Sequence, residues 1–280
     1  MKNILTIDVE DYFQVETFKN IIDENEWNNF ELRVENSLKK VLNLINSFDY
    51  KATFFVLGWI AERFPEIIKM ISAQGHEIAT HGYGHELVYK QTKQEFKNDL
   101  IKSINILTEI TENEILGYRA PTFSITNDSL WALDIIKELG LEYDASMSPI
   151  EAHDKYGIKG INPYIHTLSN GLIELPQTTI KILNKNLPVA GGGYFRLIPY
   201  WLTKMAIKKL NNNNQTAIVY LHPWEFDPEQ PKIDGISKLS QFRHYINLDK
   251  TETKFKKMLS DFNFTSIEKY LEINEVEKNA

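Results

Sequence analysis

The feature that most constrains this chain is an alternation of short apolar segments with longer amphipathic ones. Apolar segments of strand length are expected at 4–7, 53–57 and 141–143. Between them, stretches such as 34–47 repeat apolar side chains at helical spacing, which predicts amphipathic helices. Strands that alternate with helices along a chain indicate an α/β fold with parallel strands.

The alternation stops at residues 149–200, where five prolines and Gly191-Gly192-Gly193 punctuate the sequence. We interpret this stretch as an elaborated insertion with short strands rather than as a separate domain. A strand at 217–221 and a final helix resume the pattern. The expected organisation is therefore one domain over residues 1–270, followed by a charged tail at 271–280.

Charge and composition exclude several classes of protein. The 280 residues carry a net charge of −7 without a long lysine or arginine run, which argues against nucleic acid or an anionic membrane as the main partner. The chain has no cysteine, so disulfides and thiolate metal sites are excluded. No apolar run approaches the roughly 20 residues of a membrane span, and the first residues do not resemble a secretory signal. We therefore expect a cytoplasmic protein.

Two histidines, His81 and His85, follow a short buried strand that ends near Ile78-Ala79. On one turn of helix, or in a tight loop that approximates one, their i, i+4 spacing turns both imidazoles the same way. Two converging neutral imidazoles are a common start of a divalent metal site. Histidine pairs also occur as solvated or hydrogen-bonded structural features, so other residues must decide between these interpretations.

An acidic cluster, Asp8-Val9-Glu10-Asp11, ends the first predicted strand. Along a continuing strand, Asp8 and Glu10 point to the same face and Asp11 points to the other. Carboxylates crowded beside a core strand repel one another unless a cation or solvent intervenes. The cluster is therefore either part of a metal site with the histidines or a solvated turn.

Further polar residues, Arg119, Asp144 and His222, follow later predicted strands. In α/β barrels the chemistry gathers at the carboxyl ends of the strands. Two imidazoles and one carboxylate with open positions suit a hydrolytic metal site rather than a closed structural one. A second carboxylate can then act as a base on water, and an isolated histidine can protonate the leaving group.

Four motifs, in this order, resemble those of the polysaccharide deacetylases of the NodB-homology group, carbohydrate esterase family 4. Thr6-Ile7-Asp8-Val9-Glu10-Asp11 stands where T-F-D-D is usual and resembles a subgroup that spaces its acids D-x-D or D-x-E. His81-Gly82-Tyr83-Gly84-His85 corresponds to H-[ST]-x-x-H, with glycine at the hydroxyl position. Arg119-Ala120-Pro121 corresponds to R-x-P, and Leu221-His222 corresponds to a shortened L-x-H.

The resemblance extends to deacetylases of exopolysaccharide biosynthesis loci, through the stretches 8–15, 191–196 and 222–225. It implies a distorted, incomplete (β/α) barrel, NodB-like and related to the TIM barrel, with 149–200 as an elaborated region. The implied reaction removes an N-acetyl group from an amino sugar of a polysaccharide or its precursor. The implied cofactor is one divalent metal, zinc by default, although such a site also accepts other first-row metals.

Carried over residue by residue, the resemblance implies that Asp8 is the catalytic base, Arg119 holds it, and His222 is the general acid. It also implies that His81 and His85 are metal ligands.

The remaining assignments leave alternatives. Glu10 is the preferred third metal ligand because it shares the face of Asp8, and Asp11 is the alternative. Asp144 either orients His222 or caps a turn.

Three residues, Tyr194, Arg196 and Trp224, are candidates for the wall of a sugar-binding groove. Alternatively, the triple glycine before Tyr194 serves only a tight turn, and Trp224 belongs to the core.

The sequence is also compatible with two other functions. The D-V-E-D spacing is compatible with a peptidoglycan deacetylase or another amide or cyclic-imide hydrolase on the same scaffold. A protein of a different class, a carbohydrate-binding protein that lacks catalysis, would bind the same partner, an N-acetylated sugar or glycan.

Overall fold

The computed structural model describes residues 1–150, 156–182 and 185–272 of the chain, and the bounds below refer to these residues. The strands are β1 (Lys2–Val9), β2 (Thr53–Val56), β3 (Glu77–Thr80), β4 (Gly117–Tyr118), β5 (Tyr143–Asp144), β6 (His166–Thr167), β7 (Ile173–Glu174), β8 (Thr179–Ile182), β9 (Lys185–Pro188), β10 (Ile218–Leu221) and β11 (Asn263–Thr265). The α-helices are α1 (Val34–Asn46), α2 (Gly58–Arg63), α3 (Pro65–Ala73), α4 (Lys93–Thr111), α5 (Trp131–Glu138), α6 (Gly192–Leu197), α7 (Tyr200–Asn212), α8 (Lys238–Tyr245) and α9 (Leu248–Asp261).

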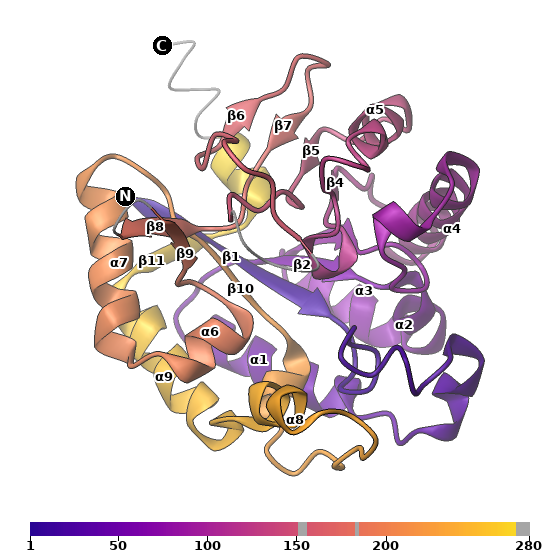
Figure 1. The fold of residues 1–280 in the computed structure, drawn as a ribbon, viewed down its shortest axis with the longest axis horizontal. Helices are drawn as coiled ribbons and strands as arrows, with labels where there is room; N and C mark the ends of the chain where they lie inside the picture. Colours follow the sequence, from indigo (N-terminus) through magenta and orange to yellow (C-terminus); the bar gives the residue numbers. More distant parts are fainter. Residues whose placement is uncertain (151–155, 183–184, 273–280) are drawn as a thin grey trace.

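Strand β1 lies inside the main sheet, which the described residues build in the order β10-β1-β2-β3-β4-β5-β7-β6. The carboxyl half of β1 pairs with β2 and β10, while its amino half pairs with β11. The pairs along this path from β10 to β7 are parallel, and β6 pairs with β7 antiparallel. This mixed sheet curls into an incomplete barrel with helices packed around it (Figure 1).

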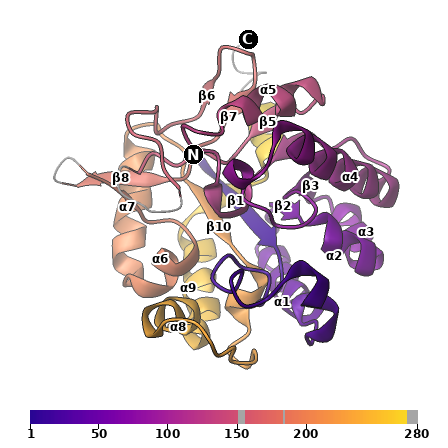
Figure 2. The same cartoon turned by 45° about the vertical axis from the view of Figure 1, so that its right-hand side comes forward.

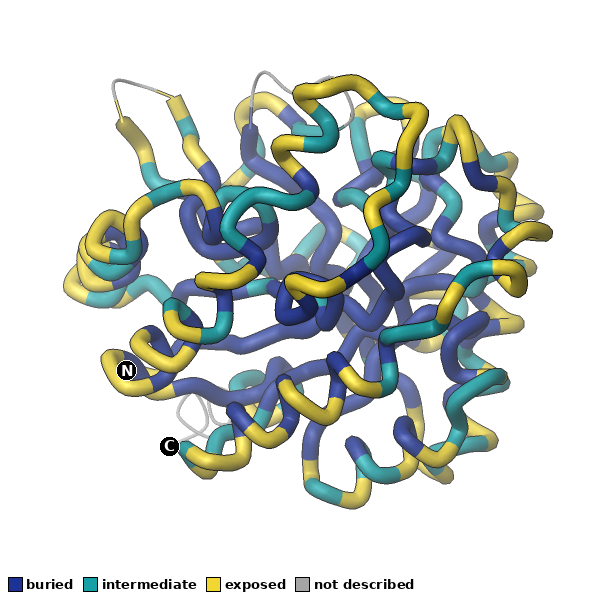
Figure 3. The backbone as a smooth tube through the Cα atoms, turned by 90° about the horizontal axis from the view of Figure 1, so that it is seen from below, coloured by how far each residue is buried: buried dark blue, intermediate teal, exposed yellow. Residues whose placement is uncertain are grey.

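Strand β1 is buried on both faces after its first residue, as expected for a strand covered on both sides. Ile4, Leu5, Ile7 and Val9 are all fully buried. Figure 2 shows α7 and α9 on one flank of the strands and α3 and α4 on the other. In Figure 3 the buried backbone runs through the middle of the molecule, and exposed backbone lies on the surrounding helices and loops.

The α/β fold class is confirmed, and so are its main elements. The helix expected at 34–47 is α1, and the strands expected at 4–7, 53–57 and 217–221 are β1, β2 and β10. Strand β5 is shorter than expected, because only Tyr143 and Asp144 pair within the sheet. Helix α2 was not predicted, since its six residues are too few to show a helical period.

Residues 149–200 contribute to the same sheet as the first half of the chain. Strand β7 pairs with β5 of that sheet. Strands β8 and β9 pair with each other and form a separate two-stranded sheet. The assignment of residues 1–270 to one domain remains our proposal, and the shared sheet supports it. In the tail expected at 271–280, residues 273–280 lie outside the described part of the chain. None of the helices described is both long and apolar enough to cross a membrane.

Candidate metal centre and catalytic pocket

The predicted site residues gather at one end of the main sheet. β1, β3 and β10 run parallel to their neighbours, so the residues at their carboxyl ends meet at the same edge. A cavity of about 400 Å³ opens there, and Asp8, Glu10, His81, His85 and His222 all line it. Such a cavity has the size of a small-molecule pocket.

His81 leaves β3 with its imidazole oriented by the backbone of the next strand. Its Nδ1 lies 2.7 Å from the carbonyl oxygen of Arg119, to which it donates as the Nδ1–H tautomer. The Nε2 lone pair is then available to a metal. Burial is the main influence on His81 and lowers its imidazole pKa to about 4, which keeps the ring neutral as a ligand must be.

The segment between the two histidines is a loop, not a helical turn. Gly82 has a φ of 75° and His85 has a φ of 54°, both in the left-handed region. The Asp99 carboxylate holds the loop by accepting the N–H groups of Tyr83 and Gly84, at 2.8 and 3.2 Å. A Cβ at position 82 would lie 2.8 Å from Asp99 Oδ2, which gives a physical reason for glycine where the family pattern has a hydroxyl residue.

Glu10 completes a group of three potential metal ligands. One donor atom from each of Glu10, His81 and His85 falls within 4.8 Å of the others, and all three residues are buried. Glu10 Oε2 lies 2.7 Å from His85 Nε2, and the Trp224 indole N–H donates to Glu10 Oε1 at 3.2 Å. Two imidazoles and one carboxylate that converge in a buried, solvent-connected pocket fit a divalent metal.

The charge state of Glu10 also suits a ligand. Burial alone would raise its pKa, but the neighbouring His85 and His222 outweigh burial and lower the pKa of Glu10 to about 2. The carboxylate is therefore ionised at neutral pH and available to a cation.

Asp11, the alternative ligand, points away from the histidines. Its carboxylate accepts the backbone N–H groups of Tyr12, Arg33 and Val34 at 2.8, 2.7 and 3.0 Å. It thereby caps the start of α1, whose own N-cap side chain makes no capping bond. The strand-face argument that preferred Glu10 agrees with this placement.

Asp8 and Arg119 form a buried ion pair beside the three potential metal ligands. Arg119 Nη1 donates to Asp8 Oδ1 and to Thr6 Oγ1, both at 2.7 Å. Arg119 Nε donates to the carbonyl oxygen of Ala145, and the guanidinium lies 4.2 Å from the ring centroid of Phe55. These contacts fix the orientation of the Asp8 carboxylate and leave Oδ2 directed toward His222 Nε2, 3.9 Å away.

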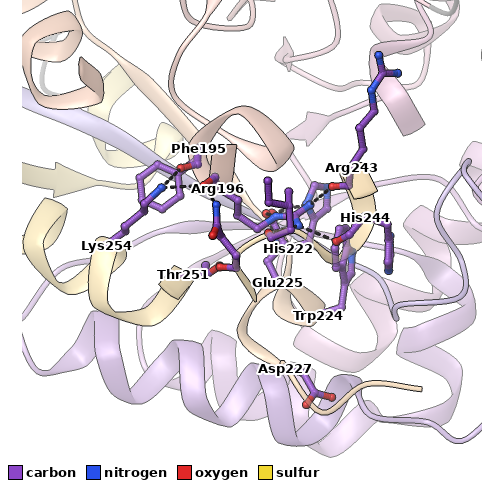
Figure 4. A network of polar contacts seen from close by, with 12 residues as sticks. Phe195, Arg196, His222, Trp224, Glu225, Asp227, Arg243, His244, Thr251 and Lys254 are labelled. Carbon is purple, nitrogen blue, oxygen red and sulfur yellow. Dashed lines mark hydrogen bonds and ion pairs between the residues drawn. The ribbon is translucent and has the colours of Figure 1, made fainter. Parts of the chain in front are cut away.

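The carboxylate of Glu225 binds His222 on the side away from the cavity, a role that the sequence analysis did not predict. His222 Nδ1 lies 2.7 Å from Glu225 Oε1, which also accepts the His222 backbone N–H at 3.0 Å. The other oxygen of Glu225 accepts from Arg196 Nε at 2.6 Å (Figure 4). His222 Nε2 is left facing the cavity, 3.5 Å from Glu10 Oε1.

The electrostatics of His222 favour its protonated form. Burial would lower the imidazole pKa, but Glu10, Glu225 and Asp8 together raise it to about 9. An imidazolium is the form that a proton donor needs before the leaving group departs.

A family model described as polysaccharide deacetylase matches residues 25–143, and one described as a domain of unknown function (DUF3473) matches residues 145–272. Residues 25–143 are thus similar to the polysaccharide deacetylases, as the motifs imply. The first matched stretch contains His81, His85 and Arg119, whereas Asp8 and Glu10 precede it and His222 follows it.

Individual relatives are similar to part of the chain. A peptidoglycan-N-acetylglucosamine deacetylase of Bacillus cereus is 32% identical over 120 residues, which are 38% of this chain and 42% of that protein. A peptidoglycan deacetylase of Helicobacter pylori is 31% identical over 113 residues, 40% of this chain and 38% of that protein. The chain thus matches less than half the length of these curated relatives.

A solved structure shares the fold over almost the whole chain. The crystal structure of a Mycobacterium smegmatis protein assigned to the polysaccharide deacetylases covers 98% of this chain and 90% of its own, with a TM-score of 0.63 and 20% identity. The expected distorted, incomplete barrel is therefore confirmed.

Asp144 is not the residue that orients His222. Its carboxylate accepts from Ser146 Oγ at 2.5 Å and from the Ser146 N–H at 3.1 Å, so the alternative role of capping a turn is the one it has. Glu174 lies beside it, and burial raises the pKa of Glu174 well above its usual range. A protonated Glu174 can then share its proton with Asp144. The expectation of an Asp144–His222 contact is corrected, because Glu225 occupies that place.

Arg196 and Tyr194 also differ from the expected groove wall. Arg196 is buried, and besides Glu225 its guanidinium donates to the carbonyl oxygens of Arg243, His244 and Ile246 (Figure 4). The described residues that line the cavity do not include Arg196 or Tyr194. Arg196 therefore holds Glu225 in place and does not line the cavity in which a sugar would bind.

Trp224 does line the cavity, and it also belongs to the support of the site. Its ring stacks on His222 and on His244, with centroid distances of 5.2 and 4.4 Å. Trp224 therefore forms part of the cavity wall, as the groove-wall interpretation expects, and is also packed between other side chains, as the core interpretation expects.

Aromatic residues that the sequence interpretation passed over form much of the remaining wall. Phe123, Tyr156 and Tyr220 line the cavity with Trp224. Thr122 and Phe123 both have positive φ angles, 57° and 54°, directly after Pro121. Non-glycine residues held in this region cost free energy and often occur at functional sites. Because neither position holds a glycine, no local pattern predicted the turn.

Proposed function

We propose that this chain is a metal-dependent hydrolase that removes the acetyl group from an N-acetylated amino sugar in a glycan or in its precursor. The observation that carries the proposal is the convergence of three ligand-type residues, a carboxylate–arginine pair and a carboxylate-bound histidine on one cavity. The match of residues 25–143 to the polysaccharide deacetylase model supports the reaction type, and the order of the motifs along the chain agrees with it.

We propose that Glu10, His81 and His85 hold one divalent ion. A borderline ion such as zinc suits two imidazoles and a carboxylate, and other first-row divalent metals are alternatives. When bound, such an ion supplies Lewis-acid polarisation of the acetamide carbonyl and activation of water.

Asp8 takes the role of base in this proposal. Its Oδ1 is held by Arg119, and its Oδ2 faces the cavity between the ligand group and His222. The carboxylate can accept a proton from the attacking water without moving, because the arginine and the β1 backbone fix its orientation.

His222 takes the role of acid. Glu225 accepts at Nδ1, so the proton to be transferred resides on Nε2, the nitrogen that faces the cavity. As the carbon–nitrogen bond of the amide breaks, His222 protonates the departing amine and the products are acetate and a free amino sugar. The Glu225 carboxylate stabilises the imidazolium until that moment.

The test combines metal analysis with a measurement of acetate release. Purified protein would be assayed on N-acetylglucosamine oligomers, peptidoglycan, and nucleotide- or lipid-linked N-acetylated sugars, with and without prior chelation. We expect stoichiometric metal and acetate release that chelation abolishes and added metal restores. Glycan binding without acetate release from any substrate would instead identify a carbohydrate-binding protein.

A second candidate is hydrolysis of another amide or a cyclic imide in the same pocket. The two-residue spacing of Asp8 and Glu10 favours this candidate, because it departs from the adjacent pair usual in the family. Ring opening of a cyclic imide without acetate release from any sugar would establish it. Among deacetylase substrates, the curated relatives make peptidoglycan the first polymer to assay.

We retain the cytoplasmic location as part of the proposal, since it would give the enzyme access to precursor sugars before their export. Fractionation of cells that express the full-length protein tests it.

A further inference from the structure

The outer face of α7 exposes an unusual number of large apolar side chains. Trp201 and Met205 are 58% and 59% exposed, Leu202 is 38% exposed, and Leu197 at the end of α6 is 51% exposed. Single exposed apolar residues are ordinary, whereas a contiguous group marks an interaction surface. Figures 1 and 2 both place α7 at the edge of the molecule.

The helix keeps this face separate from its packing face. Thr203, Ala206, Ile207 and Leu210 are buried on the inner side. Met205 follows Trp201 at i+4 and therefore lies beside it on the outer side. Because the core already occupies the inner face, the outer apolar residues are surplus to the packing of α7.

The same face is cationic. α7 contains Lys204, Lys208 and Lys209 and has no acidic residue. Beside it, Lys256 and Lys257 of α9 line a surface hollow together with Trp201.

The one acid in that hollow, Asp261, is already engaged. It accepts from Lys204 Nζ and from the Tyr200 hydroxyl, each at 2.6 Å. Lys256 is paired with Glu252 at 3.8 Å, so Lys208, Lys209 and Lys257 give this surface its positive charge on a chain whose net charge is −7.

Net charge does not cancel such a local cluster. At physiological ionic strength charges are screened over roughly 8 Å, so a surface a few residues wide responds mainly to the charges on it. The net charge that argues against an anionic membrane as a partner of the whole molecule therefore does not apply to the α7 face.

We propose that the α7 face, defined as Leu197, Trp201, Leu202, Met205, Lys208 and Lys209, docks on an anionic membrane surface. Trp201, Leu202 and Met205 lie in the first half of α7 and the two exposed lysines in the second, while Leu197 ends α6. Tryptophan with leucine and methionine inserts at the headgroup boundary, while lysines contact anionic headgroups. A protein or glycan partner would not require this combination of exposed apolar side chains and flanking lysines. The inference goes beyond the deacetylase activity and does not depend on it.

The test is co-sedimentation of the full chain with vesicles of phosphatidylcholine containing 30% phosphatidylglycerol, compared with phosphatidylcholine alone. We expect binding to the anionic vesicles, weakening as salt is raised. Lys208→Gln/Lys209→Gln should weaken binding roughly 25-fold, since each lysine near an anionic surface contributes about five-fold. Trp201→Ser/Met205→Ser should weaken it by about 10-fold or more.

The matched control is Leu239→Ser/Phe242→Ser on α8. These side chains are 58% and 53% exposed and lie next to Lys238 and Arg243, so the control removes similar apolar area beside similar charge. It should bind vesicles like the wild type, and circular dichroism should show that all variants are folded.

Three results would overturn the proposal. One is absence of wild-type binding to anionic vesicles at low salt; another is wild-type binding by the Trp201→Ser/Met205→Ser variant. The third is a dimer, or a complex with a soluble anionic polysaccharide, that this variant abolishes while vesicle binding persists. Acetate release from a soluble substrate is a separate readout, so failure of docking and failure of the proposed activity are distinguishable.

Discussion

The replacement Glu225→Gln tests the arrangement behind His222 most directly. Glu225 is fully buried, and its two oxygens accept from His222 on one side and from Arg196 on the other. A glutamine has one acceptor oxygen and one NH₂ group, so it cannot accept from both sides. Whichever way the amide turns, one buried donor is left facing another donor.

The size of the effect follows from these contacts. Removing one partner of a buried ion pair typically costs about 3–5 kcal/mol, because the remaining Arg196 charge stays buried. For a chain of this size, each 1 kcal/mol lowers the melting temperature by roughly 2–4 °C, so we expect a fall of about 10 °C. Turnover should decrease by roughly 10²–10⁴-fold, the usual contribution of a positioned proton donor.

The pH profile separates catalysis from stability. Burial lowers the pKa of His222, while Glu10, Glu225 and Asp8 raise it, to about 9 overall. Loss of the Glu225 charge should lower that pKa. A general acid works while protonated, so the alkaline limb of the rate profile should move to lower pH. A purely structural role would lower the rate at every pH without moving the limb.

The assay is acetate release as a function of pH, with differential scanning calorimetry and metal analysis of the same samples. Glu229→Gln, a nearby exposed glutamate, is the matched control and should behave like the wild type. His222→Ala should show the same loss of turnover as Glu225→Gln with unchanged metal content. Wild-type turnover in Glu225→Gln, or an alkaline limb that moves upward, would refute the role assigned to the pair.

Three further predictions concern the ligands, the base and the loop. His81→Ala, His85→Ala and Glu10→Gln should each lose metal on dialysis while Asp11→Asn retains it, as measured by elemental analysis. If Asp11→Asn loses its metal and Glu10→Gln retains it, the carboxylate ligand is Asp11 and not Glu10. Asp8→Asn should keep its metal and lose roughly 10²–10⁴-fold in turnover, so a fully active variant would exclude Asp8 as the base. Gly82→Ala should destabilise the fold by about 1–2 kcal/mol in denaturant titration, since position 82 has a positive φ and the new Cβ would crowd Asp99; unchanged stability would mean that the loop relaxes freely.

The sequence by itself determined the fold class and most of the candidate site residues that the structure brings to one cavity. The spacing of apolar residues that marks a strand or a helix is a property of a short stretch of sequence. Therefore β1, β2, α1 and β10 could be predicted without knowledge of the elements that they contact. The alternation of side chains along a strand placed Asp8 and Glu10 on one face and Asp11 on the other. Parallel strands then brought the ends of β1, β3 and β10 together, as expected.

Only the tertiary structure decided which polar residues support the site. Asp144 and Glu225 are both acids after a strand, but Asp144 pairs with Ser146 and Glu174, while Glu225 meets His222 and Arg196. Arg196 reaches the carbonyl oxygens of Arg243 and His244 because α6 packs against the end of α8. Arg196 lies 29 residues from Glu225, 47 from Arg243 and 48 from His244, so these contacts depend on how the helices pack. Glu225, by contrast, lies only three residues after His222. A buried charge is stable only where packing supplies its partner, and that is decided by the whole fold.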